Sequence, residues 1–107
     1  SSQSCIGEHG RKLLQNIWPD WAFVSCNGWD FERGITAPTE EKAALKHDLI
    51  VNAKRRVLLA DSSKYGAWSL FNVAKLDSLT DIITDAQLSP EIRQQLEVLP
   101  GRLTIAG

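Results

Sequence analysis

The segment Asp61-Ser62-Ser63-Lys64 places one carboxylate, two hydroxyls and one ammonium in four consecutive positions. Gly66 follows two residues later, and glycine lets the backbone turn sharply. Hydroxyls, loop amides and a lysine are a suitable set for holding a phosphate or a polyol. The same residue types also occur at an ordinary strand exit, where Asp and Ser satisfy loose backbone amides. From the pattern alone, both interpretations stay open.

A second lysine, Lys46, stands on the apolar face of the helix predicted after Thr39. The apolar residues of that face are Leu45, Leu49, Ile50 and Ala53. The Lys46 side chain either buries its stem and leaves its ammonium at the edge, or points into a cavity that takes an anion. Lys42 lies one turn earlier on the same side. There is therefore room for two cations to converge on one anion.

Acidic and aromatic residues near these lysines also allow two interpretations. Glu40 and Glu41 can accept hydrogen bonds from sugar hydroxyls, or stabilise the positive end of the helix dipole. Asp30 can bond a ligand or cap a turn. Trp29 follows a turn at a predicted strand end, so it could line a ligand pocket.

Other kinds of site are disfavoured by spacing. His9 and His47 lack the acidic or thiol companions of a metal site, so we expect neither a metal nor a cofactor. No local Ser–His–Asp or Cys–His signature is present. Cys5 and Cys26 are too far apart for a CxxC pair; two free thiols are favoured, and a disulfide stays open. Lys54-Arg55-Arg56 is interpreted as a solvated helix C-terminus rather than a DNA contact.

The elements that must position these residues alternate between short apolar runs and amphipathic stretches. An amphipathic helix is predicted over 11–17 and ends before Pro19. A strand over 21–26, nearly continuous in apolar residues, is expected to be covered on both faces. The later expectations are a loop with a short hairpin over 29–38, a helix from the Thr39 cap to about 54, strands over 55–60, 81–85 and 103–106, and a helix starting at Ser89-Pro90-Glu91.

This alternation predicts parallel strands joined by right-handed crossovers. The expected fold is α/β, a Rossmann-like, open and mostly parallel sheet with helices on both faces. Such sheets bind ligands beyond the carboxyl ends of their strands. That rule selects Asn27-Gly28-Trp29-Asp30 after the first strand and Asp61 to Lys64 after the second.

Composition limits the function further. The 107 residues carry 12 Lys and Arg against 13 Asp and Glu, and the pI is near 6.1, so this chain alone is a poor ligand for a polyanion. No apolar run is long enough to cross a bilayer, which predicts a soluble, cytoplasmic protein without a membrane partner. Met is absent throughout, including position 1. We therefore expect that an amino-terminal part of a longer protein is missing.

Taken together, these motifs resemble the effector domain of the DeoR-type family of bacterial repressors. The matching motifs, in chain order, are Asn27-Gly28-Trp29-Asp30, Gly34-Ile35-Thr36, Glu40 and Glu41 with Lys46, Ala60 to Gly66, and Ile83-Thr84-Asp85. The resemblance covers essentially the whole chain, and the motif over 60–66 is its most specific part. One departure is Trp29, which stands where the family usually has a small aliphatic residue.

The resemblance implies a domain related in fold to sugar-phosphate isomerases and CoA transferases. It also implies that a phosphorylated sugar or related metabolite binds, and that binding changes affinity for operator DNA. Lys46 and Lys64 would contact the anion, and Glu40 or Glu41 the sugar. The full predicted ligand-binding set is Asn27, Gly28, Asp30, Glu40, Glu41, Lys46, Asp61, Ser62, Ser63 and Lys64.

By the same resemblance, residues 1–107 are the carboxy-terminal portion of the effector-binding domain. The helix-turn-helix and the first part of the sensor domain are absent, so operator DNA would be bound only through that missing domain. The protein is expected to be a homo-oligomer and not an enzyme. Two alternatives stay open: a sugar-phosphate isomerase-like enzyme with Glu40 or Glu41 as general base, and a pure oligomerisation module.

Overall fold

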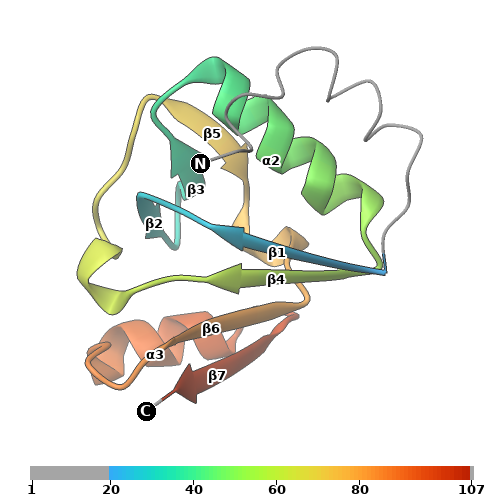
Figure 1. Cartoon of the computed structure of the whole chain (residues 1–107). Helices are drawn as coiled ribbons and strands as arrows, with labels where there is room; N and C mark the ends of the chain where they lie inside the picture. Colours follow the sequence, from blue (N-terminus) through green and yellow to red (C-terminus); the bar gives the residue numbers. More distant parts are fainter. Residues whose placement is uncertain (1–19, 107) are drawn as a thin grey trace.

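A computed structural model describes residues 20–106, which form a parallel sheet, a smaller antiparallel sheet and two α-helices (Figure 1). The parallel sheet has the order β1 (Trp21–Ser25), β4 (Arg55–Leu59), β6 (Asp81–Asp85), β7 (Arg102–Ala106). The smaller sheet has the order β2 (Gly28–Asp30), β3 (Gly34–Ala37), β5 (Phe71–Ala74). These observations confirm the α/β class, the parallel pairing and the short hairpin within 29–38. The helix predicted over 11–17 lies outside the described residues.

The helices begin at the caps that the sequence predicts. Helix α2 (Glu40–Asn52) starts after Thr39, whose hydroxyl accepts a hydrogen bond from the Lys42 amide at 3.2 Å. Helix α3 (Pro90–Glu97) starts after Ser89, whose hydroxyl accepts one from the Ile92 amide at 3.3 Å. Two short 3-10 helices, η2 (Ser62–Lys64) and η3 (Leu76–Ser78), follow β4 and β5. No helix within residues 20–106 is long and apolar enough to cross a membrane.

Both described α-helices pack on the same face of the parallel sheet. Val24, Leu58 and Ile82 from three neighbouring strands share one hydrophobic cluster with Ile50 of α2 and Leu96 of α3. Along the chain, each new strand of the parallel sheet is added next to the previous one and in the same direction. Right-handed crossovers therefore place all the connecting segments on one face of the sheet. Helices on the second face are therefore not confirmed for residues 20–106.

The second face of the parallel sheet carries exposed apolar side chains. In β1 burial alternates: Ala22 and Val24 are buried, whereas Trp21 is 53% and Phe23 56% exposed. Their rings stack with centroids 5.8 Å apart. The expectation that this strand is covered on both faces is thus wrong for the described part of the chain. An apolar run in the sequence predicts a hydrophobic strand, but it does not show which elements cover each face of that strand.

The basic cluster after α2 makes structural contacts. The Lys54 ammonium lies 3.7 Å from Asp20, and the Arg55 guanidinium donates to the Asp81 carboxylate at 2.6 Å. Arg56 donates to two backbone carbonyls at the same junction. These contacts support the interpretation of a helix–strand junction rather than a DNA-binding cluster.

Candidate functional site at the carboxyl edge

A shallow pocket of about 310 Å³ lies at the carboxyl ends of the parallel strands. Parallel strands end at a common edge, so residues far apart in sequence meet there. The lining residues are Ser25, Cys26, Leu59, Ala60, Asp61, Ile83, Thr84, Asp85 and Ala106. The edge that the sequence predicted as a binding site therefore contains a pocket, and residues at the ends of β1, β4, β6 and β7 line it.

The turn after β4 is held to the end of β6 by Asp85. Its carboxylate accepts hydrogen bonds from the Ser62 hydroxyl at 2.6 Å and from the Ser62 amide at 2.9 Å. The Gln87 amide donates to the same carboxylate at 2.9 Å. These hydrogen bonds, with that of the Ser62 side chain the strongest cause, lower the pKa of Asp85 below its ordinary value. Ser62 is thus held in place at this edge, because both its amide and its hydroxyl donate to a carboxylate from another strand.

Trp29 fixes the same turn from the smaller sheet. Its indole Nε1 donates to the Asp61 carbonyl at 2.9 Å, and its own carbonyl accepts from the Gly66 amide at 2.8 Å. The ring is fully buried and meets Tyr65 edge-on, with centroids 4.9 Å apart. Trp29 therefore does not line the pocket, contrary to the sequence-based hypothesis. It is a core residue that positions Asp61 from behind.

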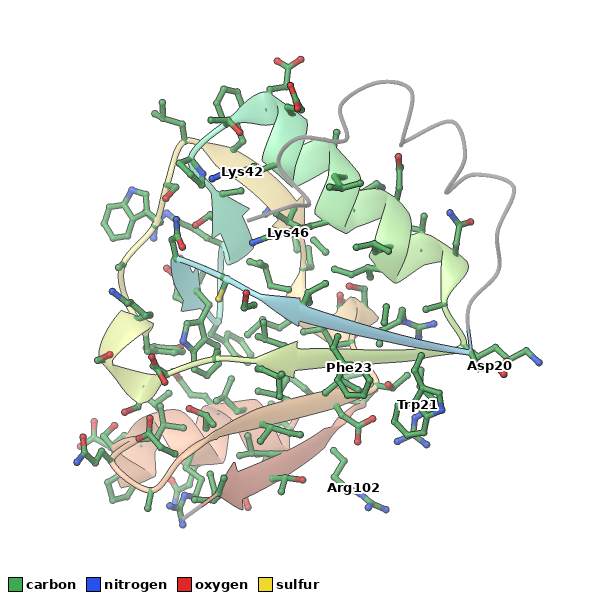
Figure 2. All side chains as sticks on the ribbon, viewed as in Figure 1. Asp20, Trp21, Phe23, Lys42, Lys46 and Arg102 are labelled. Carbon is green, nitrogen blue, oxygen red and sulfur yellow. The ribbon has the colours of Figure 1, made fainter. Side chains whose placement is uncertain are left out.

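Lys46 reaches the carboxyl end of β1 from helix α2. Its ammonium donates to the Ser25 carbonyl at 2.7 Å, and Figure 2 shows the Lys42 and Lys46 side chains extending on the same side of the helix. Burial lowers the pKa of Lys46; nearby Cys26 opposes this shift, and nearby Lys42 adds to it. The side chain is half-buried and its ammonium ends at the edge of the sheet, which is the first of the two predicted orientations; Lys46 does not itself line the pocket.

Cys26 links the lysine to the pocket. Burial raises the pKa of its free thiol to about 11, against the opposing influence of Lys46, and Asp61 adds to the rise. Cys26 and Asp61 both line the pocket, and Lys46 is near enough to the thiol to influence its pKa. At neutral pH Cys26 is an uncharged pocket wall and a poor nucleophile.

Two of the three predicted residues around the first turn have structural roles. Gly28 packs so closely that a Cβ there would lie 2.3 Å from the Ala67 carbonyl oxygen. The Asp30 carboxylate accepts from the Arg33 amide and pairs with its guanidinium at 3.2 Å, so Asp30 caps the β2–β3 turn. Asn27 is exposed immediately after the end of β1. Of the three, only Asn27 offers an exposed side chain beside the edge.

The remaining predicted residues are not all brought together. Glu40 lines a different cavity, of about 620 Å³, formed between α2 and β5, and Glu41 is exposed in the first turn of the helix. Ser63 and Lys64 are exposed in η2, beside Asp61 and Ser62. Of the predicted set, Asp61 lines the pocket, Ser62 is bonded to the lining residue Asp85, and Lys46 is bonded to the lining residue Ser25; the two glutamates are not brought to this edge.

Sequence reasoning did not select Ser25, Cys26 or Asp85 as site residues. Asp85 carried a usable signal, because Ile83-Thr84-Asp85 ends a predicted strand in the same way that the segment before Ser62 does. Ser25 contributes a carbonyl, which no side-chain pattern reveals. Among residues 20–106, no group of three or more His, Cys, Asp or Glu side chains is arranged to hold a metal ion.

Comparison with known families identifies the chain. Residues 1–86 match the family model described as the DeoR C terminal sensor domain. The chain belongs to the DeoR C-terminal sensor domain family. The turn after β4, the Gly28 turn and the strand end at Asp85 are thus elements of a sensor domain.

Curated relatives of this sensor domain are transcriptional regulators by name. The uncharacterized HTH-type regulator YgbI of Escherichia coli K12 is 34% identical over 94% of this chain and 41% of its own length. An uncharacterized HTH-type regulator of Haemophilus influenzae is 38% identical over 88% of this chain and 36% of its own length. The L-fucose operon activator of the same species is 32% identical over 89% of this chain and 38% of its own length. The chain thus spans about two fifths of the length of these relatives.

Proposed function

We propose that this sensor domain binds a phosphorylated sugar or a related metabolite at the carboxyl edge of its parallel sheet. In a longer regulator, binding would change operator affinity through a separate helix-turn-helix domain. The observation that carries the proposal is the position of Lys46. Its ammonium is bonded to the carbonyl of Ser25, which lines the pocket together with Asp61 and Asp85.

Lys46 is suited to receive an anion. It is half-buried, its pKa is lowered by that burial, and its described partner is a neutral carbonyl rather than a carboxylate. A bound phosphate would offset the desolvation of this ammonium, and Lys42 lies close enough to add to the attraction. Lys64, exposed in η2, supplies a third ammonium on a long side chain at the other side of the edge.

The part of the edge around Asp61 is suited to hydroxyl groups. Asp61 is exposed at the pocket, so its carboxylate can accept hydrogen bonds from a polyol. Ser62, Ser63 and Asn27 provide further polar groups beside it. We therefore assign the phosphate to the lysine side and the sugar to the side of Asp61.

The names of the relatives support a sensor of sugar metabolism. One is an L-fucose operon activator, and another, 32% identical over 99% of this chain, is a putative aga operon transcriptional repressor. The enzyme alternative is not favoured, because a sensor domain is regulatory. A general base must also lie within hydrogen-bond reach of its substrate, and Glu40 lines a different cavity.

We further propose that the sheet is part of a Rossmann-like domain related to sugar-phosphate isomerases and CoA transferases. The parallel order β1-β4-β6-β7 with one-directional crossovers supports this assignment. Helices on its second face would come from outside residues 20–106.

A thermal-shift titration tests the proposed ligand site. The chain is titrated with a panel of pentose and hexose phosphates, and inorganic phosphate forms a separate arm. A ligand at 100 times its Kd stabilises by about 2.7 kcal/mol, which raises the Tm of a domain of this size by roughly 10–20 °C.

Lys46→Gln should abolish the shift, whereas the matched variant Lys54→Gln should retain it. Lys54 lies at the opposite, amino-terminal end of β4 and pairs only with exposed Asp20 in the described structure. If no sugar phosphate shifts the wild-type Tm, or if Lys46→Gln responds like wild type, the proposed site is wrong.

A further inference from the structure

The buried hydroxyl of Thr84 has no hydrogen-bond partner within residues 20–106. Thr84 lies near the end of β6, is only 3% exposed, and lines the pocket at the carboxyl edge. Buried polar groups in folded proteins are almost always hydrogen-bonded, because an unpaired group loses the free energy of its hydration and gains nothing in return. An unpaired hydroxyl at a candidate ligand site therefore needs a reason other than stability.

The position of Thr84 in the strand favours an apolar side chain. Side chains alternate along a strand, so Thr84 lies on the same face of β6 as Ile82, which belongs to the hydrophobic core. Valine has nearly the same shape as threonine and is likewise enriched in strands, but it has a methyl group in place of the hydroxyl. Threonine at this position therefore lowers the stability of the domain relative to valine, and the hydroxyl is the cause.

The acidic residues around Thr84 leave its hydroxyl a distinct role. The carboxylate of Asp85 already accepts three hydrogen bonds, two from Ser62 and one from Gln87. Asp61 lines the same pocket, but a carboxylate can only accept hydrogen bonds. A hydroxyl both donates and accepts, so Thr84 can offer a proton to a ligand oxygen that neither carboxylate can serve.

We propose that Thr84 is a specificity-determining residue, whose hydroxyl donates a hydrogen bond to a hydroxyl oxygen of the bound sugar phosphate. Because this role concerns the same pocket, it rests on the proposed function. Rotation about the Cα–Cβ bond turns Oγ1 towards the pocket that the residue lines. The ligand hydroxyl that accepts this bond can donate its own proton to Asp61. Thr84 thus recognises a hydroxyl group of the sugar, whereas Lys46 attracts the phosphate.

Two substitutions in the full 107-residue chain separate ligand binding from stability. Thr84→Val removes the hydroxyl and keeps the shape. It should leave the Tm of the unliganded chain unchanged or higher, and should weaken binding of the sugar phosphate about five- to tenfold. Thr84→Ser keeps the hydroxyl and removes a buried methyl group, so it should lower the Tm and retain the affinity of wild type. A purely structural threonine would instead lose stability in Thr84→Val.

Isothermal titration calorimetry measures the affinities, and differential scanning calorimetry measures the Tm. The probe is the pentose or hexose phosphate that most stabilises the wild-type chain. Thr104→Val is the matched control, because it makes the same chemical change in β7 at an exposed side chain that does not line the pocket. This variant should bind like wild type.

Deoxy analogues of the probe, each lacking one hydroxyl group, identify the partner of Thr84. For one analogue, the wild-type chain should bind about five- to tenfold more weakly than it binds the parent sugar phosphate. Thr84→Val should bind that analogue and the parent equally, because the substitution and the missing ligand hydroxyl remove the same hydrogen bond.

The outcomes keep the two proposals apart. If no pentose or hexose phosphate binds the wild-type chain, the proposed function fails and the role of Thr84 fails with it. If wild type binds but Thr84→Val binds equally well, only the role of Thr84 is wrong. That role is also wrong if unliganded Thr84→Val unfolds at a lower temperature than wild type, since the hydroxyl would then have a partner within the chain.

Discussion

Replacing Trp29 by phenylalanine should destabilise the domain and loosen the turn that forms one wall of the pocket. The indole is fully buried, and its Nε1 donates to the Asp61 carbonyl at 2.9 Å. Phenylalanine keeps an aromatic ring in contact with Tyr65 but removes both the donor and the second ring. The substitution therefore separates the role of the indole from the general need for an aromatic residue.

The expected cost is about 2–3 kcal/mol. Losing a hydrogen bond of this kind costs about 1 kcal/mol. Removing part of the buried indole adds roughly 1–2 kcal/mol, since complete truncation of a buried Trp costs about 3–5 kcal/mol. The edge-on contact with Tyr65, worth about 0.5–1.5 kcal/mol, is largely retained.

Urea unfolding followed by circular dichroism measures this cost, and hydrogen exchange of the amides of 62–66 reports the turn. Trp68→Phe is the matched control, because Trp68 is 59% exposed and should change stability by less than about 0.5 kcal/mol. If Trp29→Phe costs no more than Trp68→Phe, or leaves exchange in the turn unchanged, the indole does not hold the Asp61 turn.

Three further predictions concern backbone, cap and titration. Gly28→Ala should lower the free energy of unfolding in urea by about 3 kcal/mol or more, because its Cβ would lie 2.3 Å from the Ala67 oxygen. Gly66→Ala should lower it by only about 1–2 kcal/mol, because the space there is open and only the φ of +89° is unfavourable. Thr39→Ala should lower stability by about 1 kcal/mol through loss of the α2 cap, and no loss would contradict the cap assignment. The pKa of Cys26 is raised from near 9 to about 11, so the folded state retains a proton that the unfolded state releases. Stability should therefore fall between about pH 9 and pH 11, and Cys26→Ala should flatten that fall in pH-dependent unfolding.

The sequence was sufficient to predict those helices and strands that are defined by neighbouring residues, such as a capping residue or a short apolar run. Thr39 and Ser89 cap helices as expected, because capping depends on residues within one turn. The strands at 55–59 and 81–85 were predicted by short apolar runs. By contrast, β5 (Phe71–Ala74) was not predicted, since four residues carry too little pattern and its pairing with β3 is set by tertiary structure.

The location of the candidate site in the fold could be predicted from the sequence, but the residues that form it could not. The carboxyl-edge rule put Asp61 at the pocket because strand direction follows from topology. It could not separate Asp30, which caps a turn, from Asp85, which binds Ser62; both are acids that follow a strand. Asp30 takes its donors from Arg33, three residues away, whereas Asp85 takes two of its donors from Ser62, 23 residues away, and that distant contact is visible only in three dimensions.

The site lies where the two sheets meet, and that position suggests how a bound metabolite can act at a distance. The turn over 61–64 is held by Asp85 at the end of β6 and by Trp29 from β2. Lys46 approaches the same edge from α2 and donates to Ser25 of β1. An anion that draws Lys46 from the Ser25 carbonyl would therefore change the carboxyl end of β1. Hydrogen exchange of the β1 amides, measured with and without a sugar phosphate that stabilises the chain, examines this connection: exchange should change in the wild type but not in Lys46→Gln. If a bound ligand leaves exchange in β1 unchanged, the site and the strand are not coupled.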